Sequence, residues 1–222
     1  MVRTLRRLID RIVLRDKQYR FLFRDEEGDE AISLDCETTG FDSWVDEIVS
    51  IAAIPIRGSR ILTSQAYCAL VRPEGAMKAR SIRVHQLREK DVERGRTMQD
   101  VLPELLHFIG SRPLVGYWID FDVRMLDKYL IEMLNIHLPN RRFDVSKLYY
   151  DRKYGNAPAG TRVDLSLASI QHDLRLPMRQ QHDAFNDALS AAEMYVILKD
   201  MTARGARIRR ERDQQGIAFS VG

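Results

Sequence analysis

Two carboxylates at the end of a short apolar run are the first feature of the sequence that could do chemistry. Asp35 and Glu37 follow Ala-Ile-Ser-Leu, which predicts a buried strand, and Thr-Thr-Gly predicts its end. Because residues i and i+2 of a strand point to the same side, the two carboxylates are expected to lie together. Like charges in a folded core are costly unless a cation neutralises them, and Mg²⁺ and Mn²⁺ prefer oxygen ligands. The pair predicts a divalent metal site, with a solvated strand end as the alternative.

Further along the chain, three more residues carry groups that suit the same chemistry. Asp122 lies where a predicted strand meets a predicted helix, so capping of backbone N–H groups is its alternative role. His182 precedes the last long predicted helix, and Asp187 falls one turn inside it. Asp187 lies on the apolar face of that helix beside Ala188, where a charge is costly unless it is paired or metal-bound.

The elements that must position these groups predict an α/β layered domain over residues 29–203. Strands followed by helices that alternate with short strands are typical of a mixed sheet covered by helices. Hydrophobic periodicity and turn signals give the expected order. Strands are expected at 31–37, 47–56 and 61–71 as an antiparallel meander, and at 113–117 and 143–145; helices at 97–110, 122–134, 145–152, 165–174 and 183–202; and an irregular segment at 74–96.

The charge is unevenly distributed along the 222 residues. The net charge is +3, but residues 1–24 carry +6 and residues 204–222 carry +3, which leaves −6 for the remainder. An acidic body suits a carboxylate–metal site, and basic ends suit a polyanion such as nucleic acid, with solvated helix faces as the alternative. The two cysteines have no metal-binding spacing and are expected to be reduced.

Both ends of the chain are expected to lie outside the domain. Residues 1–28 form a basic N-terminal extension with a helical apolar stripe and a segment at 19–23 that is expected to be extended. This extension is expected to dock on the body, on a protein partner or on nucleic acid. Residues 204–222 form a basic C-terminal tail. No apolar run reaches about 18 residues and no signal-peptide core is present, so we expect a cytoplasmic protein that does not engage a membrane.

At this point the chain resembles the DEDD superfamily of 3′–5′ exonucleases in its histidine branch. Asp35-x-Glu37, Asp122 after Phe121, and His182-x-Ala184-x-x-Asp187 are similar to the three motifs of that family, in the same order. The general likeness is to the proofreading (epsilon) subunit of bacterial DNA polymerase III and covers about residues 31–200. Val84-His85-Gln86-Leu87 also resembles a segment between the first two motifs.

The resemblance implies a ribonuclease H-like fold with a five-stranded mixed sheet flanked by helices. It implies that Asp35, Glu37, Asp122 and Asp187 hold two Mg²⁺ or Mn²⁺ ions about 3.5–4 Å apart. It also implies that His182 is the general base for the attacking water. The expected reaction removes nucleoside 5′-monophosphates from a free 3′ end. The residues expected to bind the terminal nucleotide are Thr38, Thr39, Gly40 and Phe41, with core packing as the alternative for Phe41.

The sequence also departs from the pattern of the family. Tyr117 and Trp118 stand where members often have His-Asn, and they are expected in the core, with a wall of the substrate site as the alternative. Asp120 is the alternative to Asp122 in the second motif. Asp122 is favoured because it directly follows Phe121. DNA is the favoured substrate. The alternatives are an exoribonuclease of the oligoribonuclease or ribonuclease T kind, and a nucleic-acid-binding module with weak or no activity.

Overall fold

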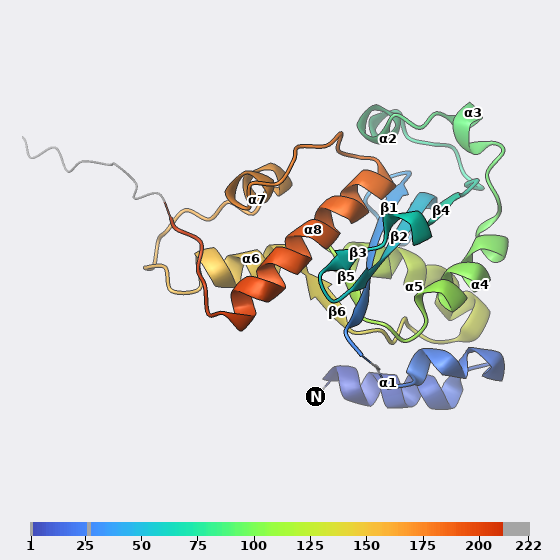
Figure 1. The fold of residues 1–222 in the computed structure, drawn as a ribbon. Coiled ribbons are helices and arrows are strands. Elements are labelled where there is room, and N and C mark those ends of the chain that lie inside the picture. Colours follow the sequence, from blue (N-terminus) through green and yellow to red (C-terminus); the bar gives the residue numbers. More distant parts are fainter. Residues whose placement is uncertain (1, 26–27, 211–222) are drawn as a thin grey trace, which may run out of the picture.

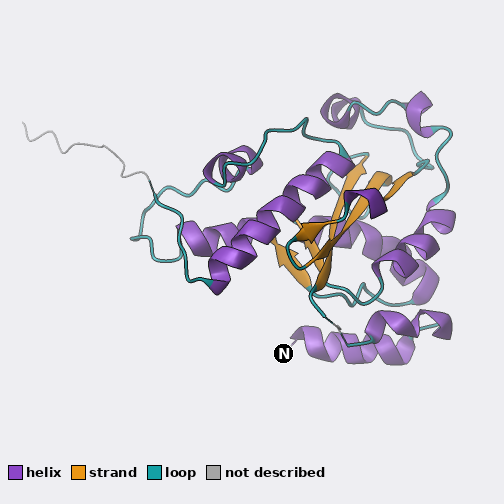
Figure 2. Cartoon of the chain, in the orientation of Figure 1, coloured by secondary structure: helices purple, strands orange, loops and turns teal. Residues whose placement is uncertain are grey.

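A single mixed sheet lies at the centre of the computed structural model, which describes residues 2–25 and 28–210 (Figures 1 and 2). Within these residues the sheet has six strands in the order β3-β2-β1-β5-β6, and β4 also pairs with β2. β1 runs antiparallel to β2 and parallel to β5, which makes the sheet mixed. The strands are β1 (Glu30–Thr38), β2 (Ile48–Arg57), β3 (Arg60–Ile61), β4 (Tyr67–Leu70), β5 (Leu114–Gly116) and β6 (Arg142–Asp144).

Helices lie on both sides of this sheet (Figure 2). One of them begins and ends at residues typical of helix caps: the Thr97 hydroxyl accepts a hydrogen bond from the backbone N–H of Asp100, and Gly110 ends the same helix with a φ of 56°. The helices are α1 (Val2–Val13), α2 (Ala79–His85), α3 (Glu89–Val92), α4 (Met98–Ile109), α5 (Asp120–Leu134), α6 (Val145–Lys153), α7 (Leu167–Asp173) and α8 (Ala184–Ala203), with 3₁₀ helices η1 (Lys17–Phe23) and η2 (Thr63–Gln65).

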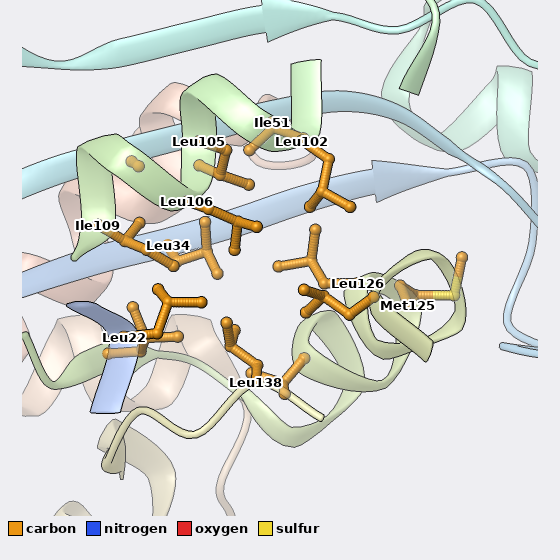
Figure 3. Close-up of a cluster of buried hydrophobic side chains, with 14 of the residues drawn as sticks. Leu22, Leu34, Ile51, Leu102, Leu105, Leu106, Ile109, Met125, Leu126 and Leu138 are labelled. Carbon is orange, nitrogen blue, oxygen red and sulfur yellow. The ribbon is translucent and has the colours of Figure 1, made fainter. Parts of the chain in front are cut away.

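Alternation along β1 separates two apolar layers. Ile32, Leu34 and Cys36 face the larger layer, which is filled by side chains of α4 and α5 (Figure 3). The opposite face of the sheet packs against α8, where the hydroxyl of Ser33 donates a hydrogen bond to the carbonyl of Ala188 at 2.7 Å. Small side chains on α8 allow this close approach to the sheet. Asp35 and Glu37, which share the alternation of Ser33, therefore lie on the side of β1 that faces α8.

Two sequence-based expectations about the elements of the body are wrong. The expected third strand, 61–71, is divided by η2 into β3 and β4, so the sheet has six strands where five were expected. The segment expected to be irregular, 74–96, contains α2 and α3. The apolar residues in and around these helices are few, and they pack in a small cluster with Val49 of β2. Because many charged residues separate them, the apolar periodicity that indicates a helix is weak in this segment.

The N-terminal segment docks on the body by two different surfaces. Residues 19–23, expected to be extended, form part of η1, and Tyr19, Leu22 and Phe23 join the larger core layer. α1 instead meets the body through polar groups, because Arg6 hydrogen-bonds the ring of His137 and a carboxylate oxygen of Asp10 lies 3.8 Å from Nδ1 of the same ring. The apolar stripe of α1 consequently faces solvent. It consists of Leu5, Leu8, Ile9, Ile12 and Val13.

The C-terminal tail lies mostly outside the described residues, since only 204–210 of the expected 204–222 are described. In the part of the chain that the structure describes, no helix is long and apolar enough to cross a membrane.

Candidate active site

The end of β1 supplies the first two acidic groups of the site. Asp35 and Glu37 point to the same side of the strand, and Cys36 between them points into the core layer of α4 and α5. Across the sheet, Asp35 is paired with Ala52 of β2, a small residue that leaves room for the start of α8 above the carboxylates. The pairing of β1 with β2 is irregular between Glu37 and Thr38, where the chain leaves the sheet.

The start of α5 brings a third carboxylate to this strand end. Asp122 is buried, and its Oδ1 accepts a hydrogen bond from the backbone N–H of Cys36 at 3.0 Å. Asp120, the competing acidic residue, turns away from this strand end and pairs with Arg142 and Lys147 at 3.2 and 3.0 Å. The structure therefore places Asp122, and not Asp120, beside Asp35 and Glu37.

The start of α8 contributes the histidine and the last carboxylate. Asp183 caps the helix by accepting the backbone N–H of Asn186 at 2.9 Å, which puts Asp187 one turn inside on the face toward β1. His182 has a left-handed backbone, with a φ of 63°, and its N–H donates to Oδ2 of Asp187 at 2.8 Å. This contact orients the Asp187 carboxylate.

The acidic groups raise one another's pKa values. Burial, followed by the charges of Asp122, Glu37 and Asp187, raises the pKa of Asp35 well above its ordinary value. Burial and the charges of Asp187 and Asp183 raise the pKa of Glu37 to about 7. Burial also raises the pKa values of Asp122 and Asp187, although the N–H donors of Cys36 and His182 oppose that rise.

This cluster fits a divalent cation. One ligand atom from each of Glu37, His182 and Asp187 lies within 4.8 Å of the other two. Asp35 and Asp122 lie at the same strand end, so the cluster could offer Mg²⁺ or Mn²⁺ the oxygen ligands that these ions prefer. A cation would also relieve the like-charge repulsion that raises the carboxyl pKa values. His182 lies close enough to serve either as a ligand or as a base, a choice that the sequence analysis did not consider.

The carboxylates open into a cavity of about 550 Å³. Its walls come from β1, the loop after it, α2, the start of α5, and the segments that precede α7 and α8. They include residues that the sequence analysis did not assign to a site. These are Cys36, Ser81, Val84, His85, Phe121, Arg124, Ser166, Leu167 and Gln181.

Two of these additional residues carry polar groups suited to a nucleotide. Arg124 brings a guanidinium to the cavity from α5. His85 comes from α2, and its Nδ1 accepts a hydrogen bond from the N–H of Leu87 at 3.1 Å. The Val-His-Gln-Leu likeness was the signal that could have identified His85; Arg124 had no such signal because it stands in an ordinary helical pattern.

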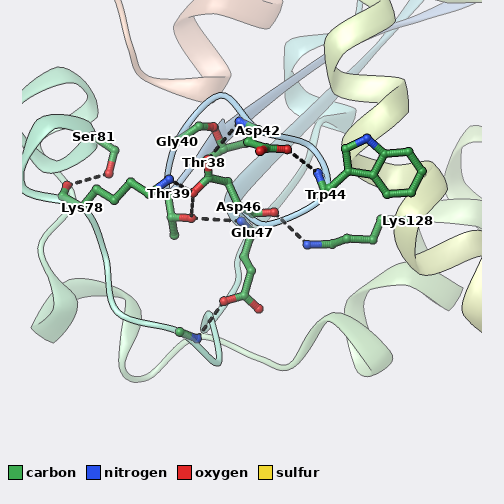
Figure 4. Close-up of polar contacts among 11 residues, drawn as sticks. Thr38, Thr39, Gly40, Asp42, Trp44, Asp46, Glu47, Lys78, Ser81 and Lys128 are labelled. Atoms are coloured by element: carbon green, nitrogen blue, oxygen red, sulfur yellow. Dashed lines mark hydrogen bonds and ion pairs between the residues drawn. The ribbon is translucent and has the colours of Figure 1, made fainter.

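The loop after β1 is held in place by hydrogen bonds and ion pairs around Asp46 (Figure 4). Asp46 is buried and pairs with Lys78 at 2.6 Å, and its carboxylate also accepts from the backbone N–H of Asp42 at 2.9 Å. A Cβ at position 40 would collide with this carboxylate, so the loop requires Gly40. The loop is therefore a fixed wall of the cavity.

One of the four residues expected to bind substrate here has a different role. Thr38, Gly40 and Phe41 line the cavity, but Thr39 does not. The N–H of Thr39 donates to the carbonyl of Glu47 at 2.8 Å, and its hydroxyl contacts Asp46 and the N–H of Glu47. Thr39 is thus a residue that holds the loop, and its backbone N–H is not available to a nucleotide.

Packing in the hydrophobic core, one of the two roles considered for these aromatic residues, is wrong for Phe41 and Trp118, because they are 73% and 58% exposed. Both border the cavity. Tyr117 is half-buried and its hydroxyl donates to the carbonyl of Leu165 at 2.9 Å, which fixes the end of β5 to the segment before α7. Trp118 has a left-handed backbone with a φ of 59°, a conformation that bulky residues rarely adopt.

Comparisons with known proteins agree with this geometry. Residues 32–195 match the family described as exonuclease. The chain is 29% identical over 173 residues to a PolC-type DNA polymerase III of Thermotoga maritima, a match that covers 77% of this chain and 12% of that relative. It is 25% identical over 182 residues to the DNA polymerase III epsilon subunit of Aquifex aeolicus, covering 77% of this chain and 81% of that protein.

Solved structures share the fold. Exonuclease X in complex with a 5′-overhanging duplex DNA superposes with a TM-score of 0.61 at 21% identity, over 80% of this chain and 95% of that one. The Escherichia coli exonuclease I–single-stranded DNA complex gives a TM-score of 0.67 at 14% identity, over 80% of this chain and 42% of that one. Both confirm the ribonuclease H-like α/β architecture.

Proposed function

The chain belongs to the exonuclease family, and on that premise we propose that it is a 3′–5′ exonuclease that releases nucleoside 5′-monophosphates from DNA by divalent-metal catalysis. The observation that carries the proposal is the convergence of four acidic groups and a histidine at one cavity. They come from three separate parts of the chain, the end of β1, the start of α5 and the start of α8.

The carboxylates would hold the metal ions. Asp35, Glu37, Asp122 and Asp187 form the donor set for two Mg²⁺ or Mn²⁺ ions. When bound, such ions neutralise charge on the scissile phosphate and favour ionisation of water. The N–H groups of Cys36 and His182 fix two of these carboxylates before any ion arrives, so the donor set is already oriented.

His182 is the group that would take the proton from the attacking water. Its exposed side chain stands at the rim of the cavity beside Glu37 and Asp187. An imidazole at this place can accept a proton and pass it to solvent. Thr38, Gly40 and Phe41 would hold the terminal nucleotide, and Arg124 would contact a phosphate of the strand.

The test is cleavage of 5′-labelled single-stranded DNA and RNA of equal sequence, with Mg²⁺, with Mn²⁺ and with EDTA. A ladder that shortens from the 3′ end and disappears in EDTA is expected. Asp122→Asn should abolish it, whereas Asp120→Asn, a matched change two residues away outside the cavity, should not. Equal losses in both variants, or cleavage that persists in EDTA, would contradict the assignment.

An exoribonuclease is the second candidate. Relatives named as DNA polymerase III components favour DNA. The same labelled pair of strands decides between the two, because faster shortening of the RNA would reassign the substrate. A binding module without activity is the outcome if folded protein cleaves neither strand with either metal.

The domain limits and a protein partner are also proposals. We assign residues 29–203 to the exonuclease domain, 1–28 to a basic extension whose helix η1 packs into the core of that domain, and 204–222 to a basic tail. We assign the exposed apolar stripe of α1 to a partner with an apolar, acidic surface, because residues 1–24 carry +6. Ile12→Asp should abolish that association without changing DNA cleavage. Retained association of this variant, measured beside the wild-type chain, would remove α1 from the interface.

A further inference from the structure

The geometry points to Trp118 as a stacking platform that selects an unpaired 3′ end. This inference rests on the proposed nuclease function and adds the class of substrate to it. Trp118 is an exposed indole on the wall of the cavity that contains the carboxylates. A platform of this kind binds a base by its flat face and tolerates any sequence.

The backbone of Trp118 shows that stability is not what favours tryptophan here. Its φ of 59° is accessible to Gly and Asn at small cost but is strained for a large side chain. The residue is 58% exposed and its ring meets that of Tyr117 only edge-on, at a centroid distance of 6.1 Å, so burial contributes little at this position. A residue that is both strained and solvent-exposed is costly to the fold, and such residues concentrate at functional sites.

The surrounding structure holds this conformation from both sides. The N–H of Trp118 donates to Oδ1 of Asp144 at 3.4 Å, and its carbonyl accepts the N–H of Phe121 at 2.8 Å. Just before it, a Cβ at Gly116 would collide with Ile119 and with the carbonyl of Leu34, so the end of β5 is closely packed. The indole is therefore presented to the cavity by a backbone with little freedom.

Trp118 is part of an aromatic wall that continues along the cavity. Phe121 follows it on the first turn of α5, and the ring of Phe41 lies 6.2 Å from the ring of Phe121. All three residues line the cavity. Trp118 and Phe41, the two exposed rings, thus offer separate platforms for successive bases of one strand.

Two separate platforms require an unpaired strand. Inside a duplex each base is hydrogen-bonded to its partner and stacked on its neighbours, so its faces are not available to protein rings. Successive bases can lie on both Trp118 and Phe41 only when the 3′ end is single-stranded or has melted. We therefore expect a strong preference for single-stranded or frayed 3′ ends over blunt duplex ends.

Fluorescence gives a direct test, because the chain contains only two tryptophans, Trp44 and Trp118. In an Asp35→Asn, Trp44→Phe double variant with Mg²⁺, the emission of Trp118 reports on its ring without degradation of the DNA. A short oligothymidylate should quench this emission saturably, and a blunt duplex should do so much more weakly. Binding detected by anisotropy of a 5′-fluorescein label, without any change in Trp118 emission, would overturn the inference.

Kinetics and stability separate a functional role from a structural one. Trp118→Asn should raise KM for single-stranded DNA by about five-fold to 100-fold, since stacking of one base contributes that much affinity. It should also raise Tm by about 2–4 °C, because Asn tolerates the left-handed backbone. Trp118→Phe should recover much of the KM. If Trp118 has only a structural role, Trp118→Asn should instead lower Tm and leave KM unchanged.

The outcomes also distinguish this inference from the proposed function. If the wild-type chain cleaves nothing, the nuclease proposal fails first. If it cleaves single-stranded and blunt duplex DNA equally well, and Trp118→Asn has the same KM as wild type, the nuclease proposal stands and only the platform is refuted.

Discussion

Replacing Glu37 with Gln should stabilise the metal-free protein while it disables the enzyme. Burial and the charges of Asp187 and Asp183 raise the pKa of Glu37 from 4.5 to about 7. A carboxyl group whose pKa is higher in the folded state stabilises the fold at low pH, and that contribution is lost as the pH rises through the folded value. Above pH 7 the ionised Glu37 therefore opposes folding unless a cation is bound.

The size of the effect follows from the change in pKa. A rise from 4.5 to about 7 corresponds to about 3 kcal/mol, at roughly 1.4 kcal/mol for each pH unit. Gln has nearly the same shape and no charge, so Glu37→Gln removes this penalty at pH 8. In a domain of this size about 3 kcal/mol corresponds to a Tm increase of roughly 6–12 °C.

The assay is thermal unfolding in EDTA at pH 8 and at pH 4.5, repeated with saturating Mn²⁺. The variant should be more stable than wild type in EDTA at pH 8 and nearly equal to it at pH 4.5, where Glu37 is protonated in the folded state and about half protonated in the unfolded chain. With Mn²⁺ the order should reverse, because the variant has lost a ligand. Glu132→Gln, at an exposed position on α5, is the matched control. It should change the free energy of unfolding by no more than about 0.5 kcal/mol at either pH. Equal Tm values of Glu37→Gln and wild type in EDTA at pH 8 would refute the reasoning.

Three further changes test other parts of the site and the fold. Arg124→Gln should weaken binding of single-stranded DNA and reduce the slope of log K against log salt by about 0.7, measured by titrations at several salt concentrations; an unchanged slope would remove Arg124 from the phosphate contacts. Asp46→Asn should destabilise the fold by about 2 kcal/mol in urea at pH 7, because it breaks the pair with Lys78. Burial raises the pKa of Asp46, but the pair with Lys78 outweighs it and holds the pKa below 3.8. The loss of stability in Asp46→Asn should therefore shrink as the pH falls below this value. A loss of stability that does not depend on pH would argue against an ionic role. Leu105→Ala should cost about 2–5 kcal/mol in the same urea assay, since Leu105 is fully buried between α4 and the sheet, and a cost below 1 kcal/mol would contradict the packing in Figure 3.

Short-range patterns in the sequence account for most of the fold. Strand alternation places Asp35 and Glu37 on one side and Cys36 on the other, and this is local geometry that needs no tertiary information. The caps at Thr97 and Asp183 are equally local, because a side chain bonds an N–H three residues away. The same kind of pattern failed for 74–96, where the helices are short and their apolar residues few.

The sequence by itself determined which acidic groups and which histidine are present and in what order, and its motifs indicated their chemistry. Only the tertiary structure decided that Asp122 faces the cavity while Asp120 turns to Arg142 and Lys147, since both stand on the first turn of one helix. It also decided that Thr39 holds the loop and that Trp118 is exposed. The physical reason is that direction and burial depend on contacts between segments far apart in the chain, which no local pattern of residue types contains.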